Sequence, residues 1–165
     1  MTKLTEQIET LLAPEAAFAY VADFANAMHW DPGVAASERV DDGPVGVGAR
    51  YRLEVHLGRR VAPMEYRISA FEPPSRVVLV GEGSGVSAVD EIRFEPSGTG
   101  TRIDYAADIR LGGALRLVQP FLGRAFTKIG RTALDGMRRT LDARAHAQAE
   151  DARSGAAGEP RTYPS

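Results

Sequence analysis

The sequence contains no cysteine, and this excludes disulfides, thiolate metal sites and cysteine nucleophiles. No run of apolar residues reaches the roughly 18 that a membrane-spanning helix needs. The first residues, 1–9, include Lys3, Glu6 and Glu9 and no apolar run, so we expect no signal peptide. We therefore expect a cytoplasmic protein without stable membrane insertion, and a reducing compartment is compatible with the lack of cysteine.

Histidine is scarce as well, with three residues in the chain. His29 lies close to Asp31 but forms no recognisable ligand set with it, His56 falls on the outward side of a predicted strand, and His146 lies near the C-terminus. We therefore expect no metal site and no cofactor. No serine has the surroundings of a nucleophile elbow or a partnered histidine, so no catalytic constellation is visible.

Composition fits one globular domain with a sizeable core, because 44% of the residues are hydrophobic and 25% are charged. The formal net charge is −2, which does not favour nucleic acid as a partner. We place the domain at residues 1–146. Residues 147–165 have little to bury, and we expect them to form a disordered tail.

Alternation of apolar and polar residues predicts most of the strands. A first strand covers 3–12, a helix starts at Pro14, a turn or second short helix covers 28–33, and a strand follows at 34–40. The later strands are predicted from their inward-facing residues: Tyr51, Leu53, Val55 and Leu57; Met64, Tyr66, Ile68 and Ala70; Val77 to Val80; Ala88, Asp90, Ile92 and Phe94; and Ile103, Tyr105, Ala107, Ile109 and Leu111.

Residues 113–145 form the longest helical pattern, with an apolar arc wider than that of a surface helix. We expect such a helix to be covered from more than one direction. Pro120 predicts a kink, or a short first helix from Gly113 followed by a restart at Pro120. Gly123 and Gly130 fall on one ridge, where they either allow a close approach by a strand, leave room for a ligand or form a plain packing notch. Arg124, Lys128, Arg131 and Arg138 lie on the opposite side, which we expect to face water.

The predicted order is a strand, one or two short helices, about six antiparallel strands and the long helix. Short connections make the sheet a meander, and a sheet of this size must curve over something apolar. The long helix is the only candidate. We therefore predict an α+β fold in which a curved antiparallel sheet of about seven strands wraps around the C-terminal helix.

Five short segments occur in an order that resembles a known superfamily. They are Ala13-Pro14-Glu15 with Phe18, Trp30-Asp31-Pro32 with Val34, Val47-Gly48, Glu72-Pro73-Pro74 before 77–80, and Phe94-Glu95-Pro96 before Gly100-Thr101. Together they are similar to the helix-grip proteins related to the START domain and the birch pollen allergen (SRPBCC), within them the polyketide cyclase/dehydrase and lipid-transport group. The resemblance covers residues 4–143. It implies a helix-grip fold around a cavity for apolar molecules, but no universal catalytic residues.

Two kinds of polar side chain fall on the inward side of the strands. Tyr51, Tyr66 and Tyr105 either line the cavity and orient a ligand or bond to main-chain carbonyls. Asp90, if buried, would need a partner or a raised pKa, and it would then be usable as an acid or base. A one-residue bulge would instead turn Asp90 to water, and this is the outcome we expect.

The candidate ligand-binding residues share an inward position on a strand or on the long helix, apart from Trp30, which either caps the cavity mouth or packs in the core. They are Trp30, Tyr51, Leu53, Val55, Tyr66, Ile68, Tyr105, Leu122, Phe126 and Ile129. We predict that a small apolar molecule, such as a lipid, polyketide, isoprenoid or aromatic metabolite, binds there to a monomer or homodimer. The alternatives are a cyclase or dehydratase that uses Asp90 and Tyr105, and an interaction module with a vestigial cavity.

Overall fold

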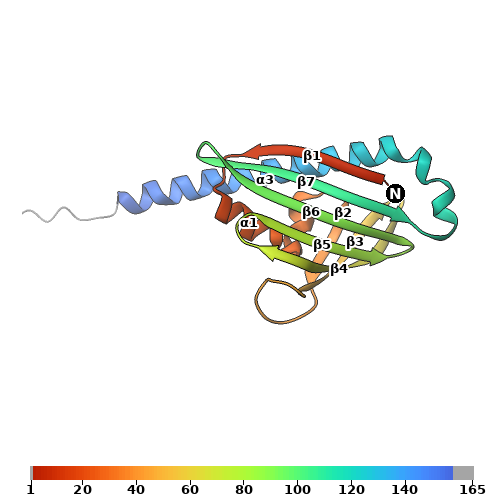
Figure 1. Ribbon diagram of the computed structural model, residues 1–165. Helices are drawn as coiled ribbons and strands as arrows, with labels where there is room; N and C mark the ends of the chain where they lie inside the picture. The colour runs from red at the N-terminus through yellow and green to blue at the C-terminus, as the bar shows by residue number, and fades with distance from the viewer. Residues whose placement is uncertain (1, 158–165) are drawn as a thin grey trace, which may run out of the picture.

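Seven antiparallel strands form one curved sheet in the computed structural model, which describes residues 2–157 (Figure 1). The strand order is β1-β7-β6-β5-β4-β3-β2. The strands are β1 (Thr2–Thr10), β2 (Val34–Arg39), β3 (Arg50–Leu57), β4 (Arg60–Glu72), β5 (Arg76–Gly83), β6 (Val86–Ser97) and β7 (Gly100–Leu111). From β2 to β7 the strands follow one another as hairpins, so the predicted meander and fold class are confirmed.

Three short helices carry the chain from β1, at one edge of the sheet, to β2, at the other. They are α1 (Pro14–Ala22), the 3-10 helix η1 (Phe24–Asn26) and α2 (Ala27–Trp30). Pro14 starts α1, as predicted, because its missing amide hydrogen costs nothing at the first helical position. The ring of Phe18 packs against Phe71 on β4 and Phe94 on β6, with ring centroids 5.2 and 5.3 Å away. These contacts fix α1 against the inner face of the sheet.

The predicted long helix is divided near Pro120. Two 3-10 helices, η2 (Gly113–Leu117) and η3 (Gln119–Phe121), precede the continuous helix α3 (Gly123–Ala156). The predicted short first helix from Gly113 is observed, but the long helix restarts at Gly123 rather than at Pro120. Figure 1 shows α3 running along the β1 edge of the sheet and projecting beyond it.

α3 does not end where we placed the start of the tail. It continues through residues 147–156, whose side chains are exposed, since each added residue keeps its main-chain hydrogen bond even without tertiary contacts. These residues are helical rather than irregular. The rest of the proposed tail, 158–165, lies outside the described residues.

The apolar arc of the long helix is covered less completely than we expected. Gly130, Ala133, Leu134, Gly136, Met137 and Leu141 are buried, but Ile129 remains 53% exposed. Leu115 and Val118, which belong to the same predicted arc, are also exposed in η2 and just after it. Arg124, Lys128, Arg131 and Arg138 face solvent as predicted. The sheet and α2 therefore bury the middle of α3, while its N-terminal turns are open on one side.

Two glycines let α3 approach its neighbours closely. A Cβ on Gly130 would lie 2.2 Å from the Leu4 side chain on β1, and a Cβ on Gly136 would lie 2.1 Å from the main-chain oxygen of Trp30 on α2. Of the interpretations offered for Gly130, close approach by a strand is observed. Gly123, in contrast, has no atom within 4 Å of the position that its Cβ would take.

We expect Gly136→Ala to destabilise the domain by roughly 1–3 kcal/mol, because the clash with a carbonyl oxygen exceeds the gain in helix propensity. Gly123→Ala is the matched control and should be neutral or slightly stabilising. Urea unfolding followed by circular dichroism measures both. Equal stability of the two variants would contradict the close packing of α3 on α2.

Candidate functional site

A cavity of about 120 Å³ lies between the sheet and α3. The sheet contributes residues from six strands, and α2, η1 and α3 supply the rest. Its walls are Leu4, Val34, Leu53, Val55, Tyr66, Ala88, Asp90, Tyr105, Ala107 and Ile109 from the sheet, and Phe24, Ala27, Trp30, Asp31, Phe126, Ile129, Gly130, Ala133 and Leu134 from the helical side. This is the space that the helix-grip resemblance implies.

Most of the candidate residues from the sequence line this cavity. They are Trp30, Leu53, Val55, Tyr66, Tyr105, Phe126 and Ile129, with Asp90 beside them. Tyr51, Ile68 and Leu122 do not line it. Tyr51 and Ile68 are fully buried in the core, where the ring of Tyr51 packs near Phe24 at 6.4 Å between centroids. Leu122 lies just before α3 starts, beyond the end of the cavity wall.

Small residues create the space, and the sequence analysis did not name them as site residues, although it offered room for a ligand as one interpretation of Gly130. Ala27, Ala88, Ala107, Gly130 and Ala133 are all buried and all lie on the wall. A larger side chain at any of these positions would fill part of the volume. The signal was available in the strands, because Ala88 and Ala107 both occur on the inward phase among larger apolar residues.

Asp90 is buried on the inner face of β6, only 4% exposed, so the expected bulge is wrong. β6 pairs with β5 and β7 without any shift in register, and Asp90 lies opposite Leu79 on one side and Ala107 on the other. The register shifts of the sheet occur elsewhere, between Val34 and Ala36 and between Ile68 and Ala70. Continuous pairing keeps the alternation of β6 in phase, and the carboxyl group therefore points inward.

Burial is the main reason that the pKa of Asp90 rises from 3.8 to about 7. A hydrogen bond from the Tyr105 hydroxyl lowers it in part, and the nearby Asp31 carboxyl raises it. Tyr105 lies diagonally across from Asp90, two residues along β7 from the directly paired Ala107. Burial and the negative charge of Asp90 raise the pKa of Tyr105 well above 10, so this phenol remains a hydrogen-bond donor.

Three further polar groups line the cavity. Asp31 ends α2, accepts a hydrogen bond from the Gly33 amide at 2.7 Å, and has a pKa raised by burial. The ring of Tyr66 lies against Gly81, where any Cβ would come within 2.5 Å of it, and burial raises the pKa of this phenol as well. The indole N–H of Trp30 is buried without a hydrogen-bond partner among the described residues.

The cavity wall carries carboxyl and phenol groups but no lysine, arginine or histidine. Nothing on the wall can neutralise the negative charge of a ligand, and two carboxyl groups would repel it. A neutral hydrogen-bonding group or a cation is the complementary chemistry. Among residues 2–157, no three histidine, aspartate or glutamate side chains group in a way that could hold a metal ion.

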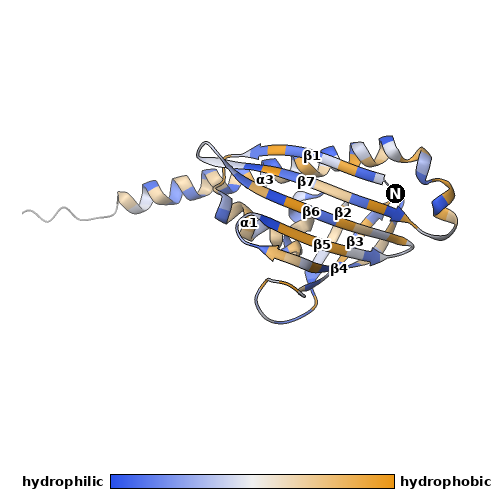
Figure 2. Ribbon diagram, in the orientation of Figure 1, coloured by the Kyte–Doolittle hydropathy of each residue, from blue (hydrophilic) through white to orange (hydrophobic). Residues whose placement is uncertain are grey.

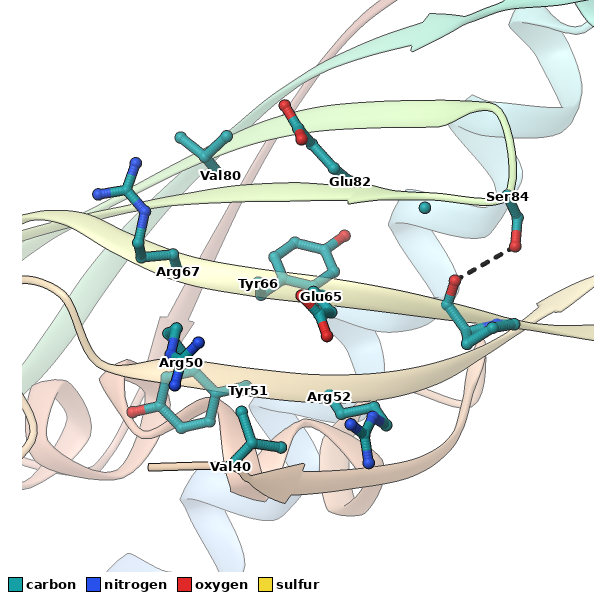
Figure 3. A pocket seen from close by; sticks show the side chains of 12 residues that line it. Val40, Arg50, Tyr51, Arg52, Glu65, Tyr66, Arg67, Val80, Glu82 and Ser84 are labelled. Atoms are coloured by element: carbon teal, nitrogen blue, oxygen red, sulfur yellow. Dashed lines mark hydrogen bonds between the residues drawn. The ribbon is translucent and has the colours of Figure 1, made fainter. Parts of the chain in front are cut away.

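A larger hollow of about 790 Å³ lies on the outer face of β3, β4 and β5 (Figure 3). Its side chains include Arg50, Arg52, Glu65, Arg67 and Glu82, all exposed. Cross-strand pairing sets Arg50 opposite Arg67 and Glu65 opposite Glu82, which places like charges side by side. Tyr51 and Tyr66 reach this hollow from the inner side of the sheet, but its charged groups are solvated and it has no buried carboxyl group. The inner cavity, which contains Asp90, is therefore the better candidate site.

Solved structures similar to this chain share its fold at low sequence identity. TTHA0849 from Thermus thermophilus has a TM-score of 0.71 and 16% identity, covering 86% of this chain and 97% of its own. A START superfamily protein from Mycobacterium smegmatis has a TM-score of 0.66 and 15% identity, covering 90% of this chain and 99% of its own. Ara h 8.0201 has a TM-score of 0.63 and 12% identity, covering 84% of this chain and 96% of its own.

Among curated protein sequences, no match to the chain was found. No helix within residues 2–157 is long and apolar enough to cross a membrane.

The family described as "Polyketide cyclase / dehydrase and lipid transport" matches residues 1–142, which include every strand and most of α3. The chain therefore belongs to the polyketide cyclase/dehydrase and lipid-transport family, and it shares its fold with the START superfamily protein and Ara h 8.0201.

Proposed function

We propose that the inner cavity binds a small, mainly apolar molecule that carries one neutral or cationic hydrogen-bonding group. The observation that carries this proposal is Asp90, a buried carboxyl group on a mainly apolar wall, with Tyr105 as its hydrogen-bond partner. A buried polar group on such a wall is costly unless it interacts. A ligand that hydrogen-bonds to this pair would offset part of that cost.

The volume narrows the class of ligand. A cavity of about 120 Å³ is close to the size of a dry apolar cavity that takes up benzene, and it lies below the usual range for drug-sized ligands. In this conformation the cavity fits a single-ring aromatic or a short branched chain. A whole lipid or polyketide would require α3 to move outward, and the open side of its first turns near Ile129 is where such movement meets least packing.

We expect benzyl alcohol and benzylamine to bind at least about tenfold more tightly than benzoate, because the cavity offers acceptors and no cation. Ala133→Leu should abolish binding by filling the space between α3 and the sheet. Ala143→Leu, an exposed position on the same helix, should leave binding unchanged. Isothermal titration calorimetry measures the affinities, and unchanged affinity in a folded Ala133→Leu variant would place the ligand elsewhere.

A second candidate function, acid–base catalysis, is favoured by the pKa of Asp90. A general base works best when its pKa lies near the working pH, and a value of about 7 meets this condition. The Asp90 carboxylate could take the proton from a carbon atom between two carbonyl groups, the reactive position of a polyketide chain. Tyr105 would orient the carboxylate through its hydrogen bond.

The catalytic candidate predicts that the protein accelerates exchange of the central protons of 2,4-pentanedione with deuterium. The rate should rise with pH and level off above about pH 7, as Asp90 becomes ionised. Asp90→Asn should lower the rate by about a hundredfold, within the usual contribution of a general base. The exchange rate is measured by NMR. If the protein does not accelerate exchange, or if Asp90→Asn accelerates it as much as the wild type does, binding remains the function.

The raised pKa also makes the stability of the domain depend on pH. Between about pH 4 and 7 the folded state keeps a proton on Asp90 that the unfolded chain has lost, and above pH 7 the folded state contains a buried charge. The free energy of unfolding should therefore fall by roughly 4 kcal/mol as the pH rises through this window.

Asp90→Asn should remove this dependence, so that the variant gains stability over the wild type as the pH rises from about 4 to 8. Asp42→Asn, in an exposed turn, should give a curve parallel to that of the wild type. Denaturant titrations at several pH values measure the difference. If the stability of Asp90→Asn changes with pH in parallel with that of the wild type, the carboxyl group is solvated.

A further inference from the structure

The segment between β7 and α3 exposes its apolar side chains and buries its polar one. Leu117 is 79% exposed and Phe121 is 84% exposed, while the polar Gln119 between them is 7% exposed. Leu115 and Val118, at 43% and 44%, add to the same exposed segment. We call these four apolar residues, Leu115, Leu117, Val118 and Phe121, the apolar tip.

The apolar tip is held in place by its buried glutamine. The Gln119 amide nitrogen donates a hydrogen bond to the Ile109 carbonyl oxygen at 2.8 Å, and the Gln119 side-chain oxygen accepts one from the Leu111 amide at 3.2 Å. A further hydrogen bond joins the Gln119 amide to the Thr2 hydroxyl at 3.3 Å. These bonds hold the polar side of η3 against β7 and β1, while Leu117 and Phe121 are exposed to solvent.

Figures 1 and 2 show this segment as the far end of the molecule, with hydrophobic colouring on its outermost turn. Basic residues surround it. From residue 109 to 134 the sequence contains Arg110, Arg116, Arg124, Lys128 and Arg131, and no aspartate or glutamate, although the whole chain has a net charge of −2. Arg116, Arg124 and Lys128, which we call the basic collar, form no ion pair with any other residue in the part of the chain that the structure describes.

We propose that the apolar tip and the basic collar dock on the surface of an anionic lipid membrane. Apolar side chains that project from a positively charged surface match the interface between acyl chains and anionic head groups. A second copy of the chain would bring two basic collars together. Nucleic acid would find one aromatic ring, that of Phe121, among three aliphatic side chains, which is less than the series of stacking rings that single strands use.

Docking at this end would place the open side of the cavity close to the lipid. Ile129 and Phe126, on the first turns of α3, line the cavity and follow the apolar tip directly in the chain. A molecule leaving the membrane would have a short path to the cavity. The docking surface goes beyond the proposed function and does not depend on it, because the tip would bind vesicles whether or not the cavity takes a ligand.

Co-sedimentation with phosphatidylcholine vesicles, with and without phosphatidylserine, tests the proposal. We expect binding to the mixed vesicles, little binding to phosphatidylcholine alone, and weaker binding as salt is added. Leu117→Ser/Phe121→Ser should weaken binding at least tenfold, and Arg116→Glu/Arg124→Glu should do the same, since each basic side chain near the surface contributes roughly fivefold. Phe121→Trp should retain binding and show a blue shift of its emission on vesicles.

Two matched controls use exposed residues away from the tip. Leu11→Ser/Val47→Ser removes apolar side chains that are 57% and 67% exposed, and Arg138→Glu/Arg153→Glu reverses two charges further along α3; both should bind as the wild type does. Circular dichroism confirms that each variant is folded.

Any of three results in the vesicle experiments would overturn the proposal. They are no binding to mixed vesicles, equal loss in the control variants, or binding that the tip variants leave unchanged. Sedimentation velocity tests self-association. If the wild type forms a dimer that Leu117→Ser/Phe121→Ser converts to monomers, and does not bind vesicles, the tip is a self-association surface instead. Tighter binding of a single-stranded RNA than of vesicles at the same salt would likewise overturn it. Failure of these experiments would not affect the binding of small aromatic ligands in the cavity.

Discussion

The close approach of α3 to β1 and α2 is the constraint on which the rest of the structure depends. A Cβ on Gly136 would clash with the main-chain oxygen of Trp30, and a Cβ on Gly130 would force the Leu4 side chain to move. Asp142 continues this seam, accepting hydrogen bonds from the Thr10 hydroxyl and the Leu11 amide at 2.7 and 2.8 Å. Because the helix is held along this line, it closes the sheet on one side and leaves its first turns open on the other.

The cavity follows from this arrangement together with a choice of small side chains. Alanine and glycine on β6, β7, α2 and α3 leave a space that the helix cannot fill without breaking its contacts with β1 and α2. Asp90 lies on that wall because its strand pairs continuously with both neighbours. Its high pKa is a consequence of the same packing, since the residues directly across from it are Leu79 and Ala107 rather than a cation.

Two surfaces of the domain carry charge in different ways. The outer hollow over β3, β4 and β5 carries arginine and glutamate side chains in open solvent. Interactions between such solvated charges contribute little to stability. The segment around η2 and η3 combines exposed apolar side chains with basic residues, and residues 109–134 contain no aspartate or glutamate. The sequence pattern had suggested that the arginines of the long helix simply face water, and the exposed Leu117 and Phe121 beside them add the apolar component that changes this interpretation.

Local patterns in the sequence determined the strands, the hairpins, the restart after Pro120 and the family, because alternation, proline and turn residues act within a few positions of the chain. Most of the cavity wall was also predictable, since inward phase follows from alternation. Only the tertiary structure decided that Asp90 is buried, that Tyr51 and Ile68 belong to the core, that Gly136 is a contact point and that Phe121 is exposed. Each of these depends on which residue of a distant segment lies opposite, and no local pattern in the chain contains that information.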